Sequence, residues 1–353
     1  MQNITVKRLA CLLAGLGSGL ASIVSAADMN KPVQVYILLG QSNMVGMGHI
    51  GGDKDGTLEH AVKVEKKYPY LVDADGNWAV WNNVRHVRVM NGRGGGMQVF
   101  NNEPMTVKSC KTIGPEFGIA QNVRQTTDAP VMILKSCIGN RSLGWDLLPP
   151  GSEGYEFADQ DKKTGKKVTY TYAGYKQSPM KWEKGAKPEP TSWYAGKQYD
   201  DDVANAKQVL SDLGKYYPGA KGYEIAGFFW WQGDKDRYDA GLASHYEQNL
   251  VRLIGQLRSD FNAPKAKFVL ATLGQTEKGN QSNPNEAVIL EAMLAVDGNS
   301  GKYPQFKGNV ATVYTHPISH GGASNGHYGG NAKTYMDVGL AMGEAMVESL
   351  KSK

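Results

Sequence analysis

The stretch "LLGQSNMVGMG" (38–48) places a serine two residues after the glycine that ends an apolar run. Gly40 permits a tight turn after a buried strand, and the turn would set Ser42 at the carboxyl edge of a sheet, where open α/β folds bind ligands. If a helix begins there, its free amides and positive end can stabilise an oxyanion. Ser42 is therefore a candidate nucleophile, although a serine in this position can also simply cap a helix.

A serine nucleophile needs a base, and histidine is the usual one. His327 lies in the glycine-rich stretch "GGASNGHYGG" (321–330), just before the last expected helix. A flexible loop over the sheet edge is a suitable place for a general base, so position alone favours His327. His316 and His320, in "YTHPISHGG" (314–322), precede the same helix and compete for this role.

The elements that would position these residues alternate along the chain. Short, largely apolar runs predict strands buried on both faces of a parallel sheet, at 33–39, 131–135, 225–230, 267–272 and 309–314. Helical patterns occupy 118–125, 203–213, 246–261 and 334–350. This alternation predicts one α/β domain, a three-layer α/β/α sandwich with a mainly parallel, doubly wound central sheet. Stretches near 45–112 and 150–200 do not fit it and are expected to be long insertions.

The first residues do not belong to this core. Lys7 and Arg8 precede an apolar stretch that ends in small residues, which predicts a signal peptide over 1–26, cleaved near Ala26. The expected protein is secreted or periplasmic, and residues 27–353 form the single domain. A transmembrane anchor is the alternative, but the apolar run is short and rich in glycine and serine, so no stable membrane insertion is expected.

The bulk composition excludes some classes of protein. Hydrophobic residues make up 41% and charged residues 21% of the 353 residues, which is typical of a globular chain. Without the two basic leader residues the formal charge falls from +5 to +3, too small a surplus to indicate nucleic-acid binding. Cys110 and Cys137 remain after cleavage, and they could either pair or stay as free thiols. No oligomeric state is predicted.

Five ordered blocks resemble the SGNH hydrolases, specifically the branch that contains sialate O-acetylesterases and family 6 carbohydrate esterases. The blocks are "ILLGQSNMVG" (37–46), "IGPEFGIAQ" (113–121), "LKSCIGNRSLGWD" (134–146), "GFFWWQGDKD" (227–236) and "GHYGGNAKTYMDVGLAMG" (326–343). The resemblance implies an SGNH, flavodoxin-like fold. It also implies a serine esterase that removes O-acetyl groups from acetylated carbohydrate, either polysaccharide or sialic acid. No metal and no organic cofactor is implied.

The resemblance assigns roles residue by residue. Ser42 would be the nucleophile and His327 the base. The amides of Ser42 and Gly139 and the side chain of Gln232 would form the oxyanion hole, although Gly139 could also be an ordinary turn after a strand. The expected substrate-binding residues are Gln41, Asn43 and Asn140.

The third member of the triad departs from the family pattern. Family members commonly carry aspartate three residues before the histidine, and this chain has Ser324 there. Asp234 stands where the branch usually has glutamate, in "QGD", and is the leading candidate for orienting the imidazole. Asp236 is the second candidate, and a backbone carbonyl is a further one. Asp234 could also be a structural carboxylate.

Two other functions fit the same sequence. A lipase or aryl-esterase on this fold would prefer longer acyl chains and have an apolar cleft. A non-catalytic glycan-binding protein would keep the fold after losing the acid. The aromatic residues of the stretch near 150–200 could stack on sugar rings or pack a hairpin.

Overall fold

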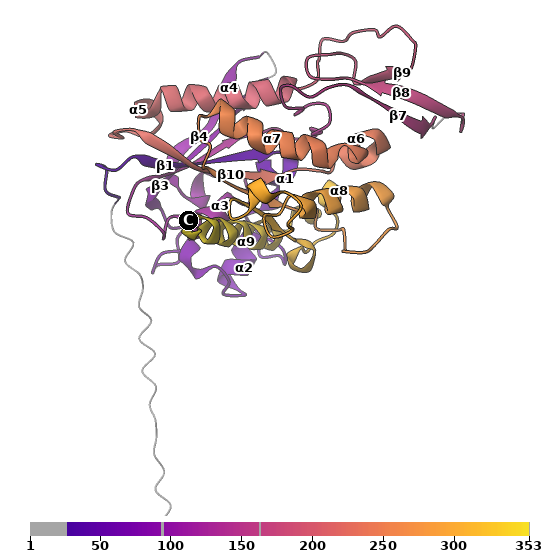
Figure 1. Ribbon diagram of the computed structural model, residues 1–353. Coiled ribbons are helices and arrows are strands. Elements are labelled where there is room, and N and C mark those ends of the chain that lie inside the picture. Colours follow the sequence, from indigo (N-terminus) through magenta and orange to yellow (C-terminus); the bar gives the residue numbers. More distant parts are fainter. Residues whose placement is uncertain (1–26, 93–94, 162–163, 353) are drawn as a thin grey trace, which may run out of the picture.

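The computed structural model describes residues 27–92, 95–161 and 164–352 (Figure 1). The signal peptide predicted over 1–26 lies outside these residues. Within the described ranges, no helix combines the length and the apolar character that a bilayer-spanning segment requires.

A seven-stranded sheet forms the centre of the molecule, in the order β12-β11-β10-β1-β6-β3-β4. All neighbouring pairs are parallel except β3 and β4, which pair antiparallel at one edge. The mainly parallel sheet predicted from the sequence is thereby confirmed. Its strands are β1 (Val33–Gly40), β3 (Trp81–Asn91), β4 (Met97–Met105), β6 (Val131–Ser136), β10 (Tyr223–Trp231), β11 (Lys267–Ala271) and β12 (Val310–Val313).

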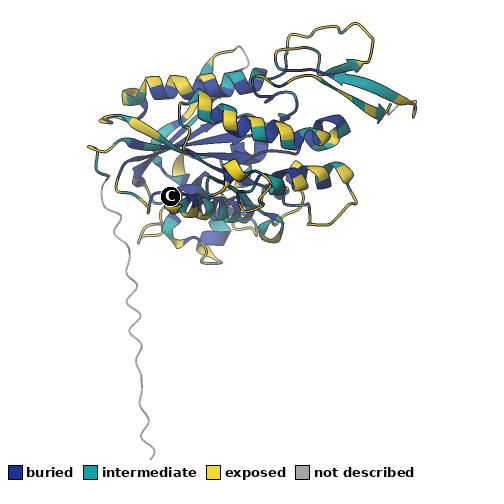
Figure 2. Cartoon of the chain, in the orientation of Figure 1, coloured by how far each residue is buried: buried dark blue, intermediate teal, exposed yellow. Residues whose placement is uncertain are grey.

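Helices cover both faces of the sheet, and strand β1 shows why. Its side chains alternate between two core clusters: Val35 and Ile37 enter one, whereas Tyr36 and Leu38 enter the other. The first cluster is completed by α4 (Lys197–Ser211), α7 (Tyr246–Asp260) and α8 (Pro284–Ala295). The second is completed by α2 (Leu58–Lys63), α3 (Glu116–Val123) and α9 (Ala332–Lys351). Figure 2 shows these helices buried toward the sheet and exposed on their outer faces.

The remaining helices are short: α1 (Ser42–Val45), α5 (Leu213–Tyr216) and α6 (Ala240–Ser244). Cys110 and Cys137 belong to the second core cluster, where Cys137 is buried and Cys110 is half-buried. Both are free thiols, which decides between the two alternatives left by the sequence.

The stretch near 45–112 is more than an insertion, because strands β3 and β4 within it extend the central sheet. Val84, Val87 and Val89 of β3 are fully buried, Val84 in the second core cluster and Val87 and Val89 in the first. The strand therefore buries valines on both faces, and Arg85 and Arg88 stand between them, so neither a plain alternation nor an apolar run marked the strand. The small sheet of β2 (Gly48–His49) and β5 (Thr112–Ile113) also lies in this stretch.

The stretch near 150–200 does leave the main body, as a three-stranded antiparallel sheet (Figure 1). Its strands are β7 (Tyr155–Gln160), β8 (Lys167–Tyr172) and β9 (Lys181–Glu183). Two tyrosines fix its base, since the Tyr155 hydroxyl donates to Gly241 O at 2.9 Å and the Tyr172 hydroxyl donates to Asp239 at 2.6 Å. The Tyr155 ring stacks on His245 and on Tyr172, so these aromatic rings pack the insertion against the domain.

Candidate active site

The candidate site lies where the chain reverses its direction of travel across the sheet. Strand β1 is flanked by β6 on one side and β10 on the other. Ser42 follows β1, Gly139 follows β6 and Asp234 follows β10. Because all three strands are parallel, these residues leave the sheet at the same edge, which is where open α/β folds bind ligands.

The turn that carries Ser42 requires a glycine at the end of β1. Gly40 has φ of +145°, and a Cβ built on it would lie 2.3 Å from Trp231 O. Helix α1 then begins at Ser42, with Gln41 as its N-cap residue and no side-chain capping bond. Ser42 is therefore the first helical residue rather than the cap, and its amide is one of the free amides at the helix start.

A buried ion pair is bonded to the end of α1. The Lys135 ammonium lies 2.6 Å from a Glu116 carboxylate oxygen and donates to Val45 O, at the end of α1, at 3.0 Å. Burial alone would raise the pKa of Glu116, but the charge of Lys135 holds that pKa below its ordinary value. The Glu116 carboxylate is thus charged at neutral pH, and the pair anchors the short helix that carries the nucleophile.

Six of the predicted site residues line one cavity of about 320 Å³. A Cβ built on Gly139 would lie 3.4 Å from Ser42 Cβ, so the Gly139 backbone directly faces the nucleophile. Within the described part of the chain, the amides of Ser42 and Gly139 donate to no protein acceptor and are available to a ligand. The six residues are Gln41, Ser42, Gly139, Asn140, Asp234 and His327.

His327 is presented to this cavity by a strained segment, residues 324–330. His327 and Tyr328 both have left-handed backbones, with φ of 52° and 53°, which side-chain-bearing residues adopt only when their surroundings enforce it. Tyr328 supplies that enforcement: its buried ring stacks on Trp231, and its hydroxyl accepts from Gly274 N at 3.1 Å. The Tyr335 hydroxyl also reaches His327 O at 3.3 Å.

The two competing histidines lie elsewhere. His316 Nδ1 is 2.9 Å from Gly274 O, and His320 Nε2 is 3.9 Å from an Asp337 oxygen. Neither lines the cavity. Among the described residues, the His327 imidazole makes no hydrogen bond to Ser42 or to Asp234, although all three line the same cavity.

Asp234 is 4% exposed and has a partner on each carboxylate oxygen. Ser324, which stands where the family pattern has aspartate, donates to Oδ1 at 2.6 Å, and Asn43 Nδ2 donates to Oδ2 at 3.3 Å. Arg237 Nε lies 3.3 Å from Oδ1. Burial raises the pKa of Asp234 above its ordinary value, while Ser324, Arg237 and His327 oppose that rise. Where the family pattern has an aspartate, this chain therefore has Ser324 bonded to a carboxylate, Asp234, that follows β10.

Asp236, the second candidate for the acid, points away from the cavity. Its carboxylate accepts from Leu143 N at 2.9 Å, from Gly144 N at 2.8 Å and from Gln232 Nε2 at 2.7 Å. Complete burial raises the pKa of Asp236 to about 6, against the effect of these three donors. Asp236 thus ties the loop that carries Gly139 to the end of β10.

The Gln232 side chain is likewise engaged behind the cavity. Besides Asp236, its Nε2 faces Arg141 O at 2.9 Å and Gln41 Oε1 at 3.0 Å, and its Oε1 accepts from the Tyr246 hydroxyl at 2.9 Å. To donate to an oxyanion, Gln232 would have to exchange one of these partners. Its role as a third donor stays a prediction. Asn43 is also buried behind the cavity, at 1% exposure.

Four further residues line the cavity that the sequence analysis did not single out: Met47, Lys235, Tyr238 and Asn325. Each lies within five residues of a motif residue, namely Ser42, Asp234 or His327. Proximity to the motifs was therefore the available signal. It could not tell which neighbours face the cavity, since Asn43 and Gln232 are also within two residues of a motif residue and face away.

One group of described residues has the side chains of a metal site. Ligand atoms of Asp55, His60 and Glu65 lie within 4.8 Å of one another. The Lys333 ammonium, however, lies 2.8 Å from both Asp55 and Glu65 and neutralises them. None of these residues lines the cavity with Ser42, so the group takes no part in the candidate site.

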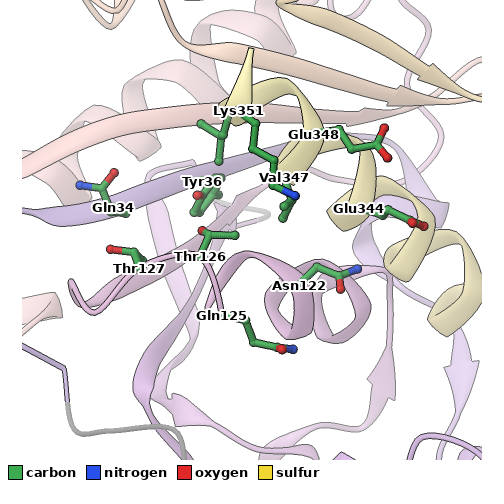
Figure 3. Close-up of a pocket in the computed structure, with 11 residues that line it drawn as sticks. Gln34, Tyr36, Asn122, Gln125, Thr126, Thr127, Glu344, Val347, Glu348 and Lys351 are labelled. Atoms are coloured by element: carbon green, nitrogen blue, oxygen red, sulfur yellow. The ribbon is translucent and has the colours of Figure 1, made fainter. Parts of the chain in front are cut away.

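A larger cavity, of about 780 Å³, is formed mainly by residues of β1, α3 and α9 (Figure 3). It includes Gln34 and Tyr36, which lie near the start of β1, whereas Ser42 follows its end. Its lining contains no histidine or cysteine, and its hydroxyls come from threonine and tyrosine. Size alone does not identify the site here, because the nucleophile and the candidate base share the smaller cavity.

Comparison with known proteins adds to this geometry. The family model for carbohydrate esterase, sialic acid-specific acetylesterase, matches residues 152–348. No curated protein matches the chain.

Similar solved structures include XAC1771, a carbohydrate acetylesterase from Xanthomonas citri, with a TM-score of 0.50 and 16% identity. The match covers 88% of this chain and 55% of that one. A protein from Arabidopsis thaliana matches with a TM-score of 0.47 and 17% identity, over 90% of this chain and 98% of that one. NanS matches with a TM-score of 0.42 and 15% identity, over 81% and 78% of the two chains. The likeness to XAC1771 supports the fold, and the family match, which spans more than half of the chain, shows that this protein belongs to the sialic acid-specific acetylesterase family of carbohydrate esterases.

Proposed function

We propose that this chain is a serine esterase that removes O-acetyl groups from carbohydrate through an acetyl-serine intermediate. The observation that carries the proposal is the shared cavity, in which Ser42, the free amides of Ser42 and Gly139, Asp234 and His327 meet. Acyl transfer needs a nucleophile, a base, and donors at the point where negative charge develops. This cavity brings all three kinds of group together.

In the proposed reaction, Ser42 Oγ attacks the acetyl carbonyl while the His327 imidazole takes the hydroxyl proton. The amides of Ser42 and Gly139 hold the oxyanion of the tetrahedral intermediate. The imidazolium returns its proton to the departing sugar hydroxyl, which leaves acetyl-serine. Water then attacks this ester with the same base, and acetate is released. Asp234 stabilises the imidazolium while it exists.

Support for a short acyl group on a carbohydrate comes from the types of side chain that line the cavity. Gln41, Asn140, Lys235 and Asn325 line it, and Met47 is its one aliphatic side chain. A long acyl chain would need several aliphatic side chains around it, whereas sugar hydroxyls would find amide and ammonium partners here. The proposal therefore predicts faster turnover of p-nitrophenyl acetate than of p-nitrophenyl octanoate, and the reverse order would favour a lipase.

The direct test is a fluorophosphonate label combined with single substitutions. We expect the label to attach to Ser42, and we expect Ser42→Ala and His327→Ala to lose acetate release almost completely, by about 10⁴-fold or more. Acetate release from acetylated xylan, pectin and sialic acid then identifies the sugar. Full turnover by Ser42→Ala would contradict the proposal.

A non-catalytic glycan-binding role is the second candidate, favoured by one observation. The His327 imidazole makes no hydrogen bond to Ser42 within the described residues, although such bonds often tighten only when substrate binds. Binding of acetylated sugar without any turnover, and without fluorophosphonate labelling, would support this second role.

A further inference from the structure

Asn43 follows the nucleophile directly, yet its side chain points into the protein. It is 1% exposed and does not line the cavity. Its Nδ2 donates to Asp234 Oδ2 at 3.3 Å and to Ser324 O at 3.2 Å, and its Oδ1 accepts from the Tyr335 hydroxyl at 3.0 Å. Both amide protons and the carbonyl oxygen are therefore in use.

These partners come from the elements that carry the acid and the base. Asp234 lies in the turn after β10, Ser324 begins the segment that carries His327, and Tyr335 lies on α9. The Tyr335 hydroxyl also reaches His327 O at 3.3 Å, so Asn43 is linked to the His327 segment directly at Ser324 and indirectly through Tyr335. A residue of α1 thereby joins the acid and the base to the helix of the nucleophile.

We propose that Asn43 is the positioning residue of this site, whose buried amide fixes Asp234 and the His327 segment relative to Ser42. The inference rests on the proposed function, because it assumes that Ser42, His327 and Asp234 act together. Asn43 would not touch the substrate, contrary to the expectation from its neighbourhood in the sequence.

The chemistry of the three contacts explains why an amide is needed. Asp234 and Ser324 O both require a donor, while the Tyr335 hydroxyl requires an acceptor. An aspartate at position 43 would place a second carboxylate against Asp234 and a carbonyl, in a site that excludes water. Alanine would leave Asp234 one donor short and free the His327 segment from α1. Other charges near Asp234 come from Arg237, Glu286 and His327.

The test uses the full chain and p-nitrophenyl acetate across about pH 5 to 9. For Asn43→Ala we expect kcat to fall by about 100-fold with KM within about twofold, because misplaced catalytic groups lower the rate more than binding. The acid limb of the kcat profile should move, since the imidazolium would face a differently held carboxylate. Asn43→Asp should be slower still.

Asn205→Ala is the matched control. Asn205, on α4, is also a buried asparagine, 4% exposed, and it does not line the cavity. Its Nδ2 donates to Asn91 Oδ1, at the end of β3, at 2.9 Å. We expect it to lower the melting temperature while leaving kcat and the pH profile unchanged. If Asn43→Ala does the same, the positioning role is refuted.

Two further variants keep the result unambiguous. Tyr335→Phe retains the ring that packs against Trp231 and removes only the hydroxyl, so it should fold, and we expect a fall in kcat of about tenfold. An unchanged kcat in this variant refutes the inference even if Asn43→Ala does not fold. Full turnover by Ser42→Ala would instead refute the proposed function, whereas an inactive Ser42→Ala beside an unaffected Asn43→Ala refutes only the positioning role.

Discussion

Two segments contribute residues to the lining of the cavity, and different kinds of group hold them in place. The loop after β6, residues 137–148, brings Gly139 to the nucleophile and is fixed by ionisable groups: Asp236 accepts from Leu143 N and Gly144 N, and Asp146 accepts from Ser142 N at 2.8 Å. The segment before α9, residues 319–331, presents His327 and is fixed by three neutral groups, Tyr328, Tyr335 and Asn43, and by one carboxylate, Asp234, which accepts from the Ser324 hydroxyl.

Because different kinds of group hold the two segments, their positions should be sensitive to different changes. Backbone amides that meet a developing charge must stay in place, and a buried carboxylate holds two of the neighbouring amides rigidly. The price is a buried acid whose protonation affects stability. A histidine base must gain and lose a proton, and most of the groups that hold its segment are neutral and do not change charge near neutral pH. The stability of the first segment should therefore depend on pH more than that of the second.

The largest expected effect comes from removing the carboxylate that holds the first segment. Asp236→Ala would leave Leu143 N and Gly144 N buried without acceptors, at about 1–3 kcal/mol each. We expect the free energy of unfolding to fall by about 4 kcal/mol, measured by urea denaturation, with loss of esterase activity.

Asp234→Ala is the matched comparison for this prediction. Its abandoned donors are the side chains of Ser324, Asn43 and Arg237, which can move toward the cavity, whereas backbone amides cannot. We expect a smaller loss of stability from this variant. Equal losses from the two variants would contradict the contrast between the segments.

The second effect is the pH dependence of stability that Asp236 contributes. Its folded pKa of about 6 exceeds its ordinary value of 3.8, so the folded state holds the proton more tightly than the unfolded state. Its contribution to the free energy of unfolding therefore falls as pH rises from about 4 to about 6, by about 3 kcal/mol.

Comparing wild type with Asp236→Asn by urea denaturation across this range isolates the group, because the asparagine does not titrate. The difference between the two unfolding free energies should decline through the window and level off above it. A constant difference would show that Asp236 does not titrate there.

The smallest effects come from two tyrosine hydroxyls, one that bonds Gln232 behind the first segment and one that belongs to the second segment. Tyr246→Phe removes the donor to Gln232 Oε1, and Tyr328→Phe removes the acceptor of Gly274 N. Each should lower the free energy of unfolding by about 1–2 kcal/mol. We expect Tyr328→Phe to lower kcat more than Tyr246→Phe, because the Tyr328 hydroxyl holds the strained backbone next to His327. The reverse order in kcat would argue against that role.

Part of the site could be anticipated because its signals are local. Gly40 before Ser42 marks a turn that only glycine fits, and the blocks around Gly139, Asp234 and His327 follow strands or precede a helix in the expected order. Strand β3 was missed because arginines stand between its buried valines, and β4 was missed because Pro104 and polar side chains give it the character of an edge.

Which side chains face the cavity was decided by long-range packing. Asn43 and Gln232 lie near motif residues, as Asn140 does, yet their side chains turn inward to partners that are distant in the sequence. The partners of Asn43 include Asp234 and Tyr335, which are 191 residues or more away. Gln232 bonds Arg141, which is 91 residues away. A hydrogen bond forms only between groups that the folded chain brings within about 3 Å.

The sequence by itself therefore determined the alternating strands and helices, the glycine turn and the chemical groups present, because periodicity and backbone freedom are local properties. Only the tertiary structure decided that Asp234 faces His327's cavity while Asp236, two residues later, holds the opposite loop. That choice depends on which buried donors each carboxylate meets, and those donors come from strands and loops that are distant in the chain.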